Sequence, residues 1–263
     1  MGMERTLLLI EDDDTTREVL TVLLEAEGWK TLAAPSGEDA LRLLTSTEAP
    51  PAVILTDQQL PGIAGQDLAI KLRELLRARQ AQAILLGMSA SVQEAPGFDA
   101  MLRKPFQAAD VRAIYEQLSS THVVPGRDKS PYKSDGNLLT LDEAVCLKLE
   151  GQMGLRARDL YCFAMTDAND RLGRMSQALT ESDMTSFHKE AHALKGSSGM
   201  IGARRLSALA AQAEKMTAAG SAQAPSHQLL TDMHRACDEI HLMLETRFPL
   251  VVEGETPKSV SRA

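Results

Sequence analysis

The sequence predicts two consecutive folds: a doubly wound α/β domain with a five-stranded parallel sheet, followed by an all-α helical bundle. Over the first 120 residues, short apolar runs alternate with amphipathic stretches, which is typical of parallel strands connected by helices. A stretch rich in Ser, Pro, Gly and charge then interrupts the pattern. Beyond this stretch only helical periodicity is visible, and no strand is expected.

Five apolar runs are the expected strands of the first domain. The runs at 5–10, 52–56 and 82–88 are almost continuously apolar, as expected for strands covered by helices on both faces. The remaining two are 30–34 and 100–102. Leucine-rich stretches with helical spacing lie between the strands and after the last one, which predicts right-handed crossover connections.

The second half reads as helices joined by short connections, which favours an antiparallel bundle. The clearest helix is the last, where five apolar residues from Leu229 to Leu244 fall on one face. The expected helices are 141–150, 157–179, 183–198, 204–219 and 226–248. We therefore expect a first domain at 1–120, a flexible linker at 121–137, a helical domain at 138–248 and a disordered tail at 249–263.

Composition and charge exclude several classes of protein. The 263 residues are 44 % hydrophobic and 24 % charged, the balance of an ordinary globular protein. No apolar run approaches the ~20 residues of a membrane span, and the N-terminus is a poor signal peptide. The three cysteines are scattered and lack CxxC spacing, which predicts neither a disulfide framework nor a zinc cluster and fits a reducing cytoplasm.

The negative charge is concentrated in the first domain. Residues 1–120 hold 11 Lys and Arg against 18 Asp and Glu, whereas the remainder holds 17 against 18. Binding to nucleic acid without sequence preference needs basic residues that displace counterions. We therefore expect no nucleic-acid partner.

Polar side chains follow four of the predicted strands at the point where each strand ends. The first strand ends in an acidic run at 11–14, and the third ends in Asp57. Ser89 follows the fourth strand, and Lys104 follows the fifth. Because the carboxyl ends of the strands line the ligand crevice of an open α/β sheet, these side chains are expected to converge.

Such a cluster suits phosphoryl chemistry. Carboxylates repel one another unless positive charge lies among them, and an oxygen-lined pocket suits Mg²⁺. Asp57, separate from the acidic run, is the candidate nucleophile that forms an aspartyl phosphate, while Mg²⁺, Lys104 and Ser89 would neutralise the transferring oxygens. Asp13 and Asp14 have a plainer interpretation as acids and caps at a helix N-terminus. Asp57 alone would read as a turn residue, but the other strand ends disfavour that interpretation.

The first 120 residues resemble the receiver domain of bacterial response regulators. "LLLIEDD" is similar to that family's acidic pair and "ILTDQQLPGIAG" to its phosphoacceptor loop. "GMSA" resembles its Ser/Thr switch, which implies that Ser89 contacts the phosphoryl group. "RKPF" resembles its Lys-Pro pair, which implies that Lys104 pairs with that group.

The same resemblance implies the phosphorylated residue and the metal ligands. Asp57 would be phosphorylated, and Glu11 and Asp12 would hold Mg²⁺ directly or through water. The backbone carbonyl of Gln59 would be a further ligand. Two features depart from the family: Met101 stands where an aromatic residue is usual, and only 14 residues separate Ser89 from Lys104. We therefore expect a shortened fourth helix and an altered output face.

A second candidate site lies on the predicted helix 183–198. Helical spacing places His188, His192, Lys195, Gly196 and Gly199 on one face, and the opposite stripe of Phe187, Ala191 and Leu194 is expected to face the core. His192 would then be presented to solvent, with clearance provided by glycine and positive charge by lysine. A histidine that attacks a phosphoryl group on a partner needs this clearance and a neutral ring.

Other interpretations of these histidines stay open at this point. A histidine on a helix is more often a solvated surface residue. His188 and His192 have zinc spacing, but "HKEAH" lacks the glutamate that follows the first histidine of a metalloprotease helix. "AHALKGSSGMIGA" resembles the phosphorylation helix of histidine phosphotransfer (HPt) domains, and 138–248 resembles that four-helix-bundle family. The resemblance implies His192 as phosphoacceptor, Lys195 as stabiliser, and Gly196 and Ser197 as the contact turn.

Together these features predict a cytoplasmic phosphorelay intermediate that carries phosphoryl groups on Asp57 and His192. Its expected partners are a sensor histidine kinase and a separate response-regulator receiver. No ATP-binding motif of a kinase is visible in the sequence, so the protein is expected to pass phosphoryl groups on without taking them from ATP. The alternative is a non-catalytic adaptor in which the receiver gates access to His192. A metal-dependent hydrolase built from His188, His192 and the acidic cluster is a third interpretation.

Overall fold

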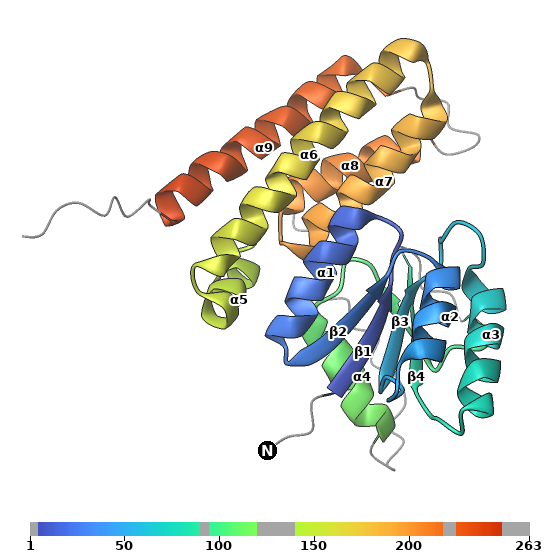
Figure 1. Cartoon of the computed structure of the whole chain (residues 1–263). Helices are drawn as coiled ribbons and strands as arrows, with labels where there is room; N and C mark the ends of the chain where they lie inside the picture. Colours follow the sequence, from blue (N-terminus) through green and yellow to red (C-terminus); the bar gives the residue numbers. More distant parts are fainter. Residues whose placement is uncertain (1–4, 90–94, 120–139, 218–224, 249–263) are drawn as a thin grey trace, which may run out of the picture.

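The computed structural model describes residues 5–89, 95–119, 140–217 and 225–248 of the chain (Figure 1). The linker predicted over 121–137 and the tail predicted over 249–263 lie outside the described residues. In the described ranges no helix is both long enough and apolar enough to cross a membrane.

The N-terminal domain is the predicted α/β fold. Its five strands lie in the order β2-β1-β3-β4-β5, and all neighbouring pairs are parallel. Helices connect the first four strands, which gives a doubly wound sheet. The elements are β1 (Arg5–Ile10), α1 (Asp14–Ala26), β2 (Trp29–Ala34), α2 (Gly37–Ser46), β3 (Val53–Asp57), α3 (Gly65–Ala78), β4 (Ile84–Ser89), β5 (Ala100–Arg103) and α4 (Ala108–Ser119).

Strand alternation divides the apolar residues of this domain between two layers. Leu7 and Leu9 of β1 face the layer that contains α1 and α4. Leu8 and Ile10 face the opposite layer, which contains α2 and α3. Both faces of the sheet are therefore covered, which explains why the central strands are almost continuously apolar.

The connection between β4 and β5 departs from the alternating pattern. Its described part, 95–99, contains no helix, and α4 comes directly after β5. The shortened fourth helix was expected between Ser89 and Lys104, and residues 90–94 of that segment lie outside the described residues. Asp99 holds this stretch against the sheet, because its carboxylate accepts a 2.7 Å hydrogen bond from the backbone N–H of Leu85.

The C-terminal region is helical throughout its described length, as predicted. Its elements are α5 (Glu143–Met153), α6 (Arg156–Glu181), α7 (Met184–Met200), α8 (Arg204–Thr217) and α9 (His227–Arg247). Helix α6 packs against α7 and α9, and α8 also packs against both, which forms a four-helix bundle. The predicted core stripe of α7 is confirmed, since Phe187, Ala191 and Leu194 are fully buried.

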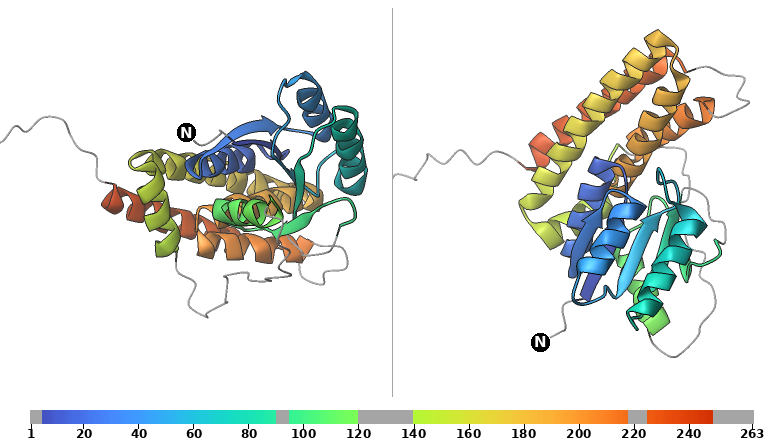
Figure 2. Two further views of the ribbon diagram at one scale, coloured as in Figure 1. Left: turned by 90° about the horizontal axis from the view of Figure 1, so that it is seen from below. Right: turned by 45° about the vertical axis from the view of Figure 1, so that its right-hand side comes forward.

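Helix α1 connects the two halves of the molecule in space. It packs on the sheet with one side and against α6 and α7 with the other, and it lies between the sheet and the bundle in Figures 1 and 2. One apolar cluster runs from Leu20 and Leu24 of α1 to Leu149 of α5 and Tyr161 of α6. The domains therefore share a continuous apolar core.

Candidate functional site

The structure brings three of the predicted site residues of the α/β domain into direct contact. Glu11 follows β1, Asp57 ends β3 and Lys104 follows β5, so the parallel register delivers them to one edge of the sheet. Lys104 Nζ lies 2.7 Å from Glu11 Oε2 and also binds Asp57 Oδ2. All three side chains are buried, which makes this a desolvated cluster of two carboxylates and one ammonium group.

Burial dominates the electrostatics of this cluster. It raises the pKa of Glu11 to about 7, and the nearby Lys104 only partly opposes this effect. For Lys104 itself, burial lowers the pKa, but attraction to Glu11 and Asp57 outweighs burial and the net shift is upward. The pKa of Asp12 is raised, mainly by burial. The carboxylates are thus crowded enough to gain from additional positive charge.

The donor set fits Mg²⁺. Carboxylate oxygens of Glu11, Asp12 and Asp57 all lie within 4.8 Å of one another, and hard oxygen ligands of this kind suit Mg²⁺. The backbone N–H of Gln59 donates a 2.9 Å hydrogen bond to Asp57 Oδ1, which fixes the orientation of that carboxylate. A phosphoryl group bound to Asp57 would also lie close to the ammonium group of Lys104.

Two predicted features of the α/β domain lie beside this cluster. Ser89 ends β4 at the same edge and is half-buried, but it is not part of the lining of the cavity described below. Met101 is half-buried and pairs in register with Gly87. A Cβ on Gly87 would lie 2.5 Å from the sulfur of Met101, so the thioether fills the space that the glycine leaves.

His192 occupies a defined position on α7. Its Nδ1 lies 2.5 Å from Glu214 Oε1 of α8, and Lys195 Nζ lies 2.6 Å from the other oxygen of the same carboxylate. An ionised carboxylate only accepts hydrogen bonds, so Nδ1 must donate. In the neutral ring Nε2 is then the nitrogen with the free lone pair.

Glu214 is a site residue that the sequence analysis missed. Burial alone would raise its pKa, but hydrogen bonds from His192 and Lys195 outweigh burial and lower the pKa to about 2. The carboxylate is therefore ionised at neutral pH. Lys195, which was expected to stabilise a phosphoryl group, is paired with Glu214.

The structure also shows the surroundings of Ser197 and His192 on α7. Ser197, which was expected on the contact turn, is buried, and its hydroxyl donates to the carbonyl of Ala193 at 3.2 Å. His192 was expected to face solvent, yet its side chain is only 26 % exposed, and it faces the α/β domain across the cavity described next. His188 Nδ1 lies 2.9 Å from Thr217 Oγ1, and the three-carboxylate group found among the described residues does not include it.

A cavity of about 700 Å³ lies between the two domains and contains both predicted phosphoacceptors in its lining. From the α/β domain it is lined by residues of the acidic cluster, and from the bundle by one face of α7 and by charged residues of α6. The lining residues that belong to the predicted sites are Glu11, Asp12, Asp57, Gln59, Lys104, His192, Lys195 and Gly196. Two sites that lie 135 positions apart in the sequence therefore face one space.

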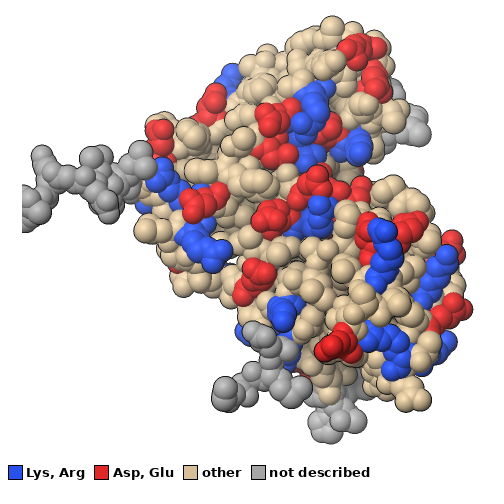
Figure 3. Space-filling model, in the orientation of Figure 1, with Lys and Arg blue, Asp and Glu red and all other residues tan. Residues whose placement is uncertain are grey.

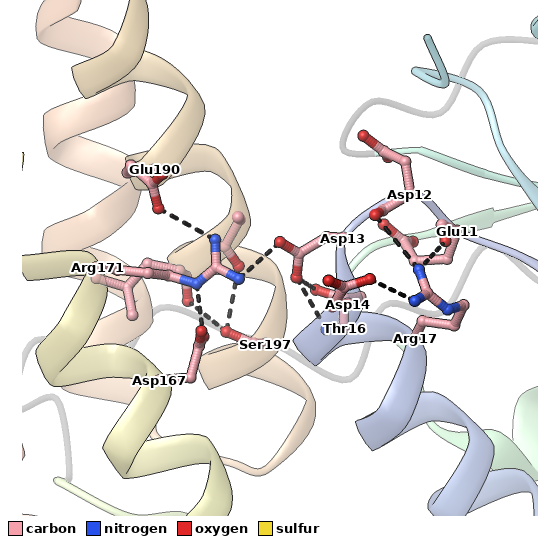
Figure 4. A network of polar contacts seen from close by, with 12 residues as sticks. Glu11, Asp12, Asp13, Asp14, Thr16, Arg17, Asp167, Arg171, Glu190 and Ser197 are labelled. Atoms are coloured by element: carbon pink, nitrogen blue, oxygen red, sulfur yellow. Dashed lines mark hydrogen bonds and ion pairs between the residues drawn. The ribbon is translucent and has the colours of Figure 1, made fainter. Parts of the chain in front are cut away.

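Charged groups join the domains beside this cavity. Arg171 of α6 is buried, and its guanidinium lies 2.6 Å from Asp13, 2.5 Å from Asp167 and 3.2 Å from Glu190 (Figure 4). Asp13 belongs to the α/β domain and the other two carboxylates to the bundle. Basic and acidic side chains also gather at the surface where the two domains meet (Figure 3).

Comparison with known protein families identifies both halves. The response regulator receiver domain model matches residues 7–116, and the Hpt domain model matches residues 162–246. The chain contains a receiver domain followed by an Hpt domain. Together these domains indicate a two-component phosphorelay protein, which agrees with the resemblances noted in the sequence.

The relatives are similar to the chain over parts of their length. The transcriptional regulatory protein AfsQ1 of Streptomyces coelicolor is 37 % identical over 118 residues, which are 41 % of this chain and 50 % of that protein. The sensor histidine kinase AruS of Pseudomonas aeruginosa is 26 % identical over 207 residues, 74 % of this chain and 19 % of that protein. The chain thus spans half or less of the length of these two relatives.

Among solved structures, the receiver domain of the sensor histidine kinase PA1611 from Pseudomonas aeruginosa, with magnesium in its active-site cleft, is 22 % identical. The match covers 43 % of this chain and 95 % of that domain, with a TM-score of 0.38.

Proposed function

We propose that the protein is a phosphorelay intermediate that carries phosphoryl groups on Asp57 and His192 between two-component signalling partners. The observation that supports this most is that both side chains line one cavity between the domains. The partners would be a sensor histidine kinase that supplies the group and a separate receiver that accepts it, acting in the cytoplasm. The proposed domains are the receiver at 1–120 and the Hpt bundle at 138–248.

The first step places the phosphoryl group on Asp57. A carboxylate oxygen attacks the phosphorus of a phosphohistidine on the kinase, a P–O bond forms, and the P–N bond breaks with its electron pair returning to that imidazole. Lys104 holds the Asp57 carboxylate and carries positive charge into a buried site. It therefore stabilises the added negative oxygens. Ser89 is proposed as a further contact to the phosphoryl group.

Glu11, Asp12 and Asp57 would hold Mg²⁺, with the carbonyl of Gln59 as a further ligand. When bound, Mg²⁺ supplies positive charge that neutralises phosphoryl oxygens during transfer. The crowded carboxylates of this site support the assignment, because all three oxygens lie within 4.8 Å of one another.

The second step moves the group to His192. The Nε2 lone pair attacks phosphorus, a P–N bond forms, and the P–O bond to Asp57 breaks with its electron pair returning to the carboxylate. No proton is released, because Nδ1 keeps its proton and donates it in a hydrogen bond to the Glu214 carboxylate throughout. The Glu214 carboxylate stabilises the positive charge that develops on the ring, and Lys195 keeps that carboxylate in place.

The test is to follow label from a small acyl phosphate in the presence of Mg²⁺. Wild-type chain is expected to accumulate label on both residues, which differ because aspartyl phosphate is labile to base and phosphohistidine is labile to acid. Asp57→Ala is expected to abolish labelling, and His192→Ala is expected to leave only base-labile label. If neither substitution changes the labelling, the proposal is wrong.

A second function is favoured by the position of the receiver over the α7 face. In this alternative the receiver is a non-catalytic gate that controls the access of partners to His192. The two functions differ in one observable: phosphate moves from Asp57 to His192 only in the relay.

A further inference from the structure

Helix α1 of the receiver is held by the Hpt domain at both of its ends. At the N-terminal end, Asp13 is the helix cap, and its Oδ1 accepts a 2.9 Å hydrogen bond from the backbone N–H of Thr16. Its other oxygen, Oδ2, binds Arg171 of α6 at 2.6 Å. One carboxylate therefore starts the helix and joins the two domains.

The C-terminal end of α1 makes a second polar contact. Glu27, the residue that ends the helix, is buried, and its Oε1 accepts hydrogen bonds from Lys148 at 2.9 Å and Gln152 at 2.8 Å. Both donors belong to α5 of the Hpt domain. One carboxylate at each end of this 13-residue helix therefore contacts the bundle. The two contacts fix where α1 lies along the bundle.

Gly199 of α7 permits this close approach. A Cβ on Gly199 would lie 2.9 Å from the ring of Pro105, which follows the receiver lysine. A Cβ on Gly196 would lie 3.9 Å from Thr16 of α1. The helix therefore presents a surface without side chains where the receiver docks, and His192 lies on the same surface.

We propose that the receiver docks on its own Hpt domain and excludes separate receivers from His192, with the Asp13–Arg171 ion pair selecting this arrangement. The inference rests on the proposed function, because it concerns which receiver exchanges phosphoryl groups with His192. The partner that the Hpt surface fits is a receiver domain with a carboxylate at the N-cap of its first helix. The chain's own receiver satisfies this requirement and is always present.

Competition follows from the position of the cavity. His192 reaches it from one side, and the receiver forms the opposite wall. A second receiver must bring its aspartate to that same wall, so both cannot dock at once. The linked receiver competes at an effective concentration near the millimolar range expected for short linkers. The linked receiver must therefore separate from the Hpt domain before a separate receiver can reach His192.

The Asp13–Arg171 ion pair can be broken by a substitution in the receiver or by one in the Hpt domain, and the two have different consequences. Asp13→Asn keeps a cap oxygen but removes the charge that binds Arg171, and it leaves the Hpt surface intact. Arg171→Gln alters the Hpt surface itself. Asp14→Asn is the matched control, because Asp14 is 89 % exposed and pairs with Arg17 of its own domain.

Transfer within one chain and transfer between chains can then be measured separately with full-length proteins. The donor for transfer between chains carries Arg171→Gln and His192→Ala, so that its receiver is intact, released and labelled by acyl phosphate on Asp57. The acceptor carries Asp57→Ala, alone or with Asp13→Asn or Asp14→Asn. Transfer within one chain is measured with dilute protein that is wild type, carries only Asp13→Asn or carries only Asp14→Asn. Small-angle X-ray scattering reports the radius of gyration of each variant.

Asp13→Asn is expected to slow transfer within the chain and to speed transfer into the acceptor. Each rate is expected to change by about tenfold, an effect of the size that loss of a charge pair at an interface produces. Its radius of gyration is expected to increase. Asp14→Asn is expected to change none of these quantities. Initial labelling of Asp57 is compared among the variants, so that a change in the acidic site is separated from a change in docking.

The proposal is overturned if Asp13→Asn behaves as Asp14→Asn does in both transfers and in scattering. It is also overturned if both transfer rates fall together, because release of the linked receiver would then not have opened His192 to a separate receiver. Should wild-type His192 never accept label, the proposed function fails, and the scattering comparison still decides whether the Asp13–Arg171 pair holds the domains together.

Discussion

The Nδ1 atom of His192 lies 2.5 Å from a carboxylate oxygen of Glu214, whose second oxygen is bound by Lys195. This carboxylate fixes the tautomer of the imidazole and leaves Nε2 as its nucleophile. The ion pair with Lys195 holds this carboxylate in place beside the ring. The reactivity of His192 therefore depends on a residue of a neighbouring helix.

Removing this carboxylate is predicted to slow phosphorylation of His192. Glu214→Ala loses both the tautomer control and the negative charge that stabilises the phosphorylated ring, so the transfer rate is expected to fall about 10- to 100-fold, as for other groups that orient an imidazole. Glu214→Gln is expected to recover part of the rate, because its amide oxygen still accepts from Nδ1. Single-turnover transfer of label measures both. Glu239→Gln, which removes a charge from a surface pair with Arg205, is the control, and a matching loss there would contradict the assigned role.

The low pKa of Glu214 predicts how the stability of the protein depends on pH. The pKa is about 2 in the folded chain and 4.5 as the reference value, so the folded state binds fewer protons between these limits. The resulting stabilisation is complete above about pH 4.5 and is lost as the pH falls toward 2. After allowance for partial exposure it is about 1–2 kcal/mol.

Urea denaturation of wild type and Glu214→Gln from about pH 6 to about pH 3 measures this contribution. The wild type is expected to be the more stable protein at the upper end, and the difference is expected to shrink as the pH falls. A difference that stays constant over this range would show that the ionisation of Glu214 contributes nothing to folding.

Lys104 is predicted to stabilise the receiver by neutralising two buried carboxylates. Lys104→Met leaves Glu11 and Asp57 without their ammonium partner, and breaking a buried ion pair in this way costs about 3–5 kcal/mol. Mg²⁺ is expected to restore part of the lost free energy of unfolding, because it supplies positive charge to the same oxygens. Denaturation with and without Mg²⁺ measures both effects. Lys71→Met on the exposed face of α3 is the control, and equal losses in the two variants would contradict the prediction.

The two glycines of α7 are predicted to respond differently to the same substitution. Gly196→Ala has room for its methyl group and is expected to raise stability by up to about 1 kcal/mol through helix propensity. Gly199→Ala places its methyl 2.9 Å from Pro105 and 3.1 Å from Ser207. It is expected to increase the radius of gyration and slow transfer within the chain. Equal behaviour of the two variants would show that this contact does not position the receiver.

The strand ends were predictable because a parallel sheet delivers its carboxyl ends to one edge. Glu11, Asp57 and Lys104 could therefore be grouped from spacing alone, and they lie in direct contact. The buried stripe of α7 was equally predictable, since helical periodicity separates it from the face that carries His192.

The partners of these residues could not be predicted from local pattern. Glu214 lies on a different helix from His192, and no periodic rule relates the two positions. Arg171 did leave a signal: it falls on the apolar stripe of α6 between Ala168 and Met175, where a charge must find a partner. The identity of that partner, Asp13, depends on how the two domains pack, which sequence spacing does not specify.

The central claim is that Asp57 and His192 of one chain exchange a phosphoryl group, and a dilution series tests it most directly. Wild-type chain labelled on Asp57 by a brief exposure to acyl phosphate is separated from the donor and followed at several protein concentrations. We predict that acid-labile label appears on His192 with a first-order rate constant that does not change on dilution. A rate that falls in proportion to protein concentration, or label that never reaches His192, would contradict the account.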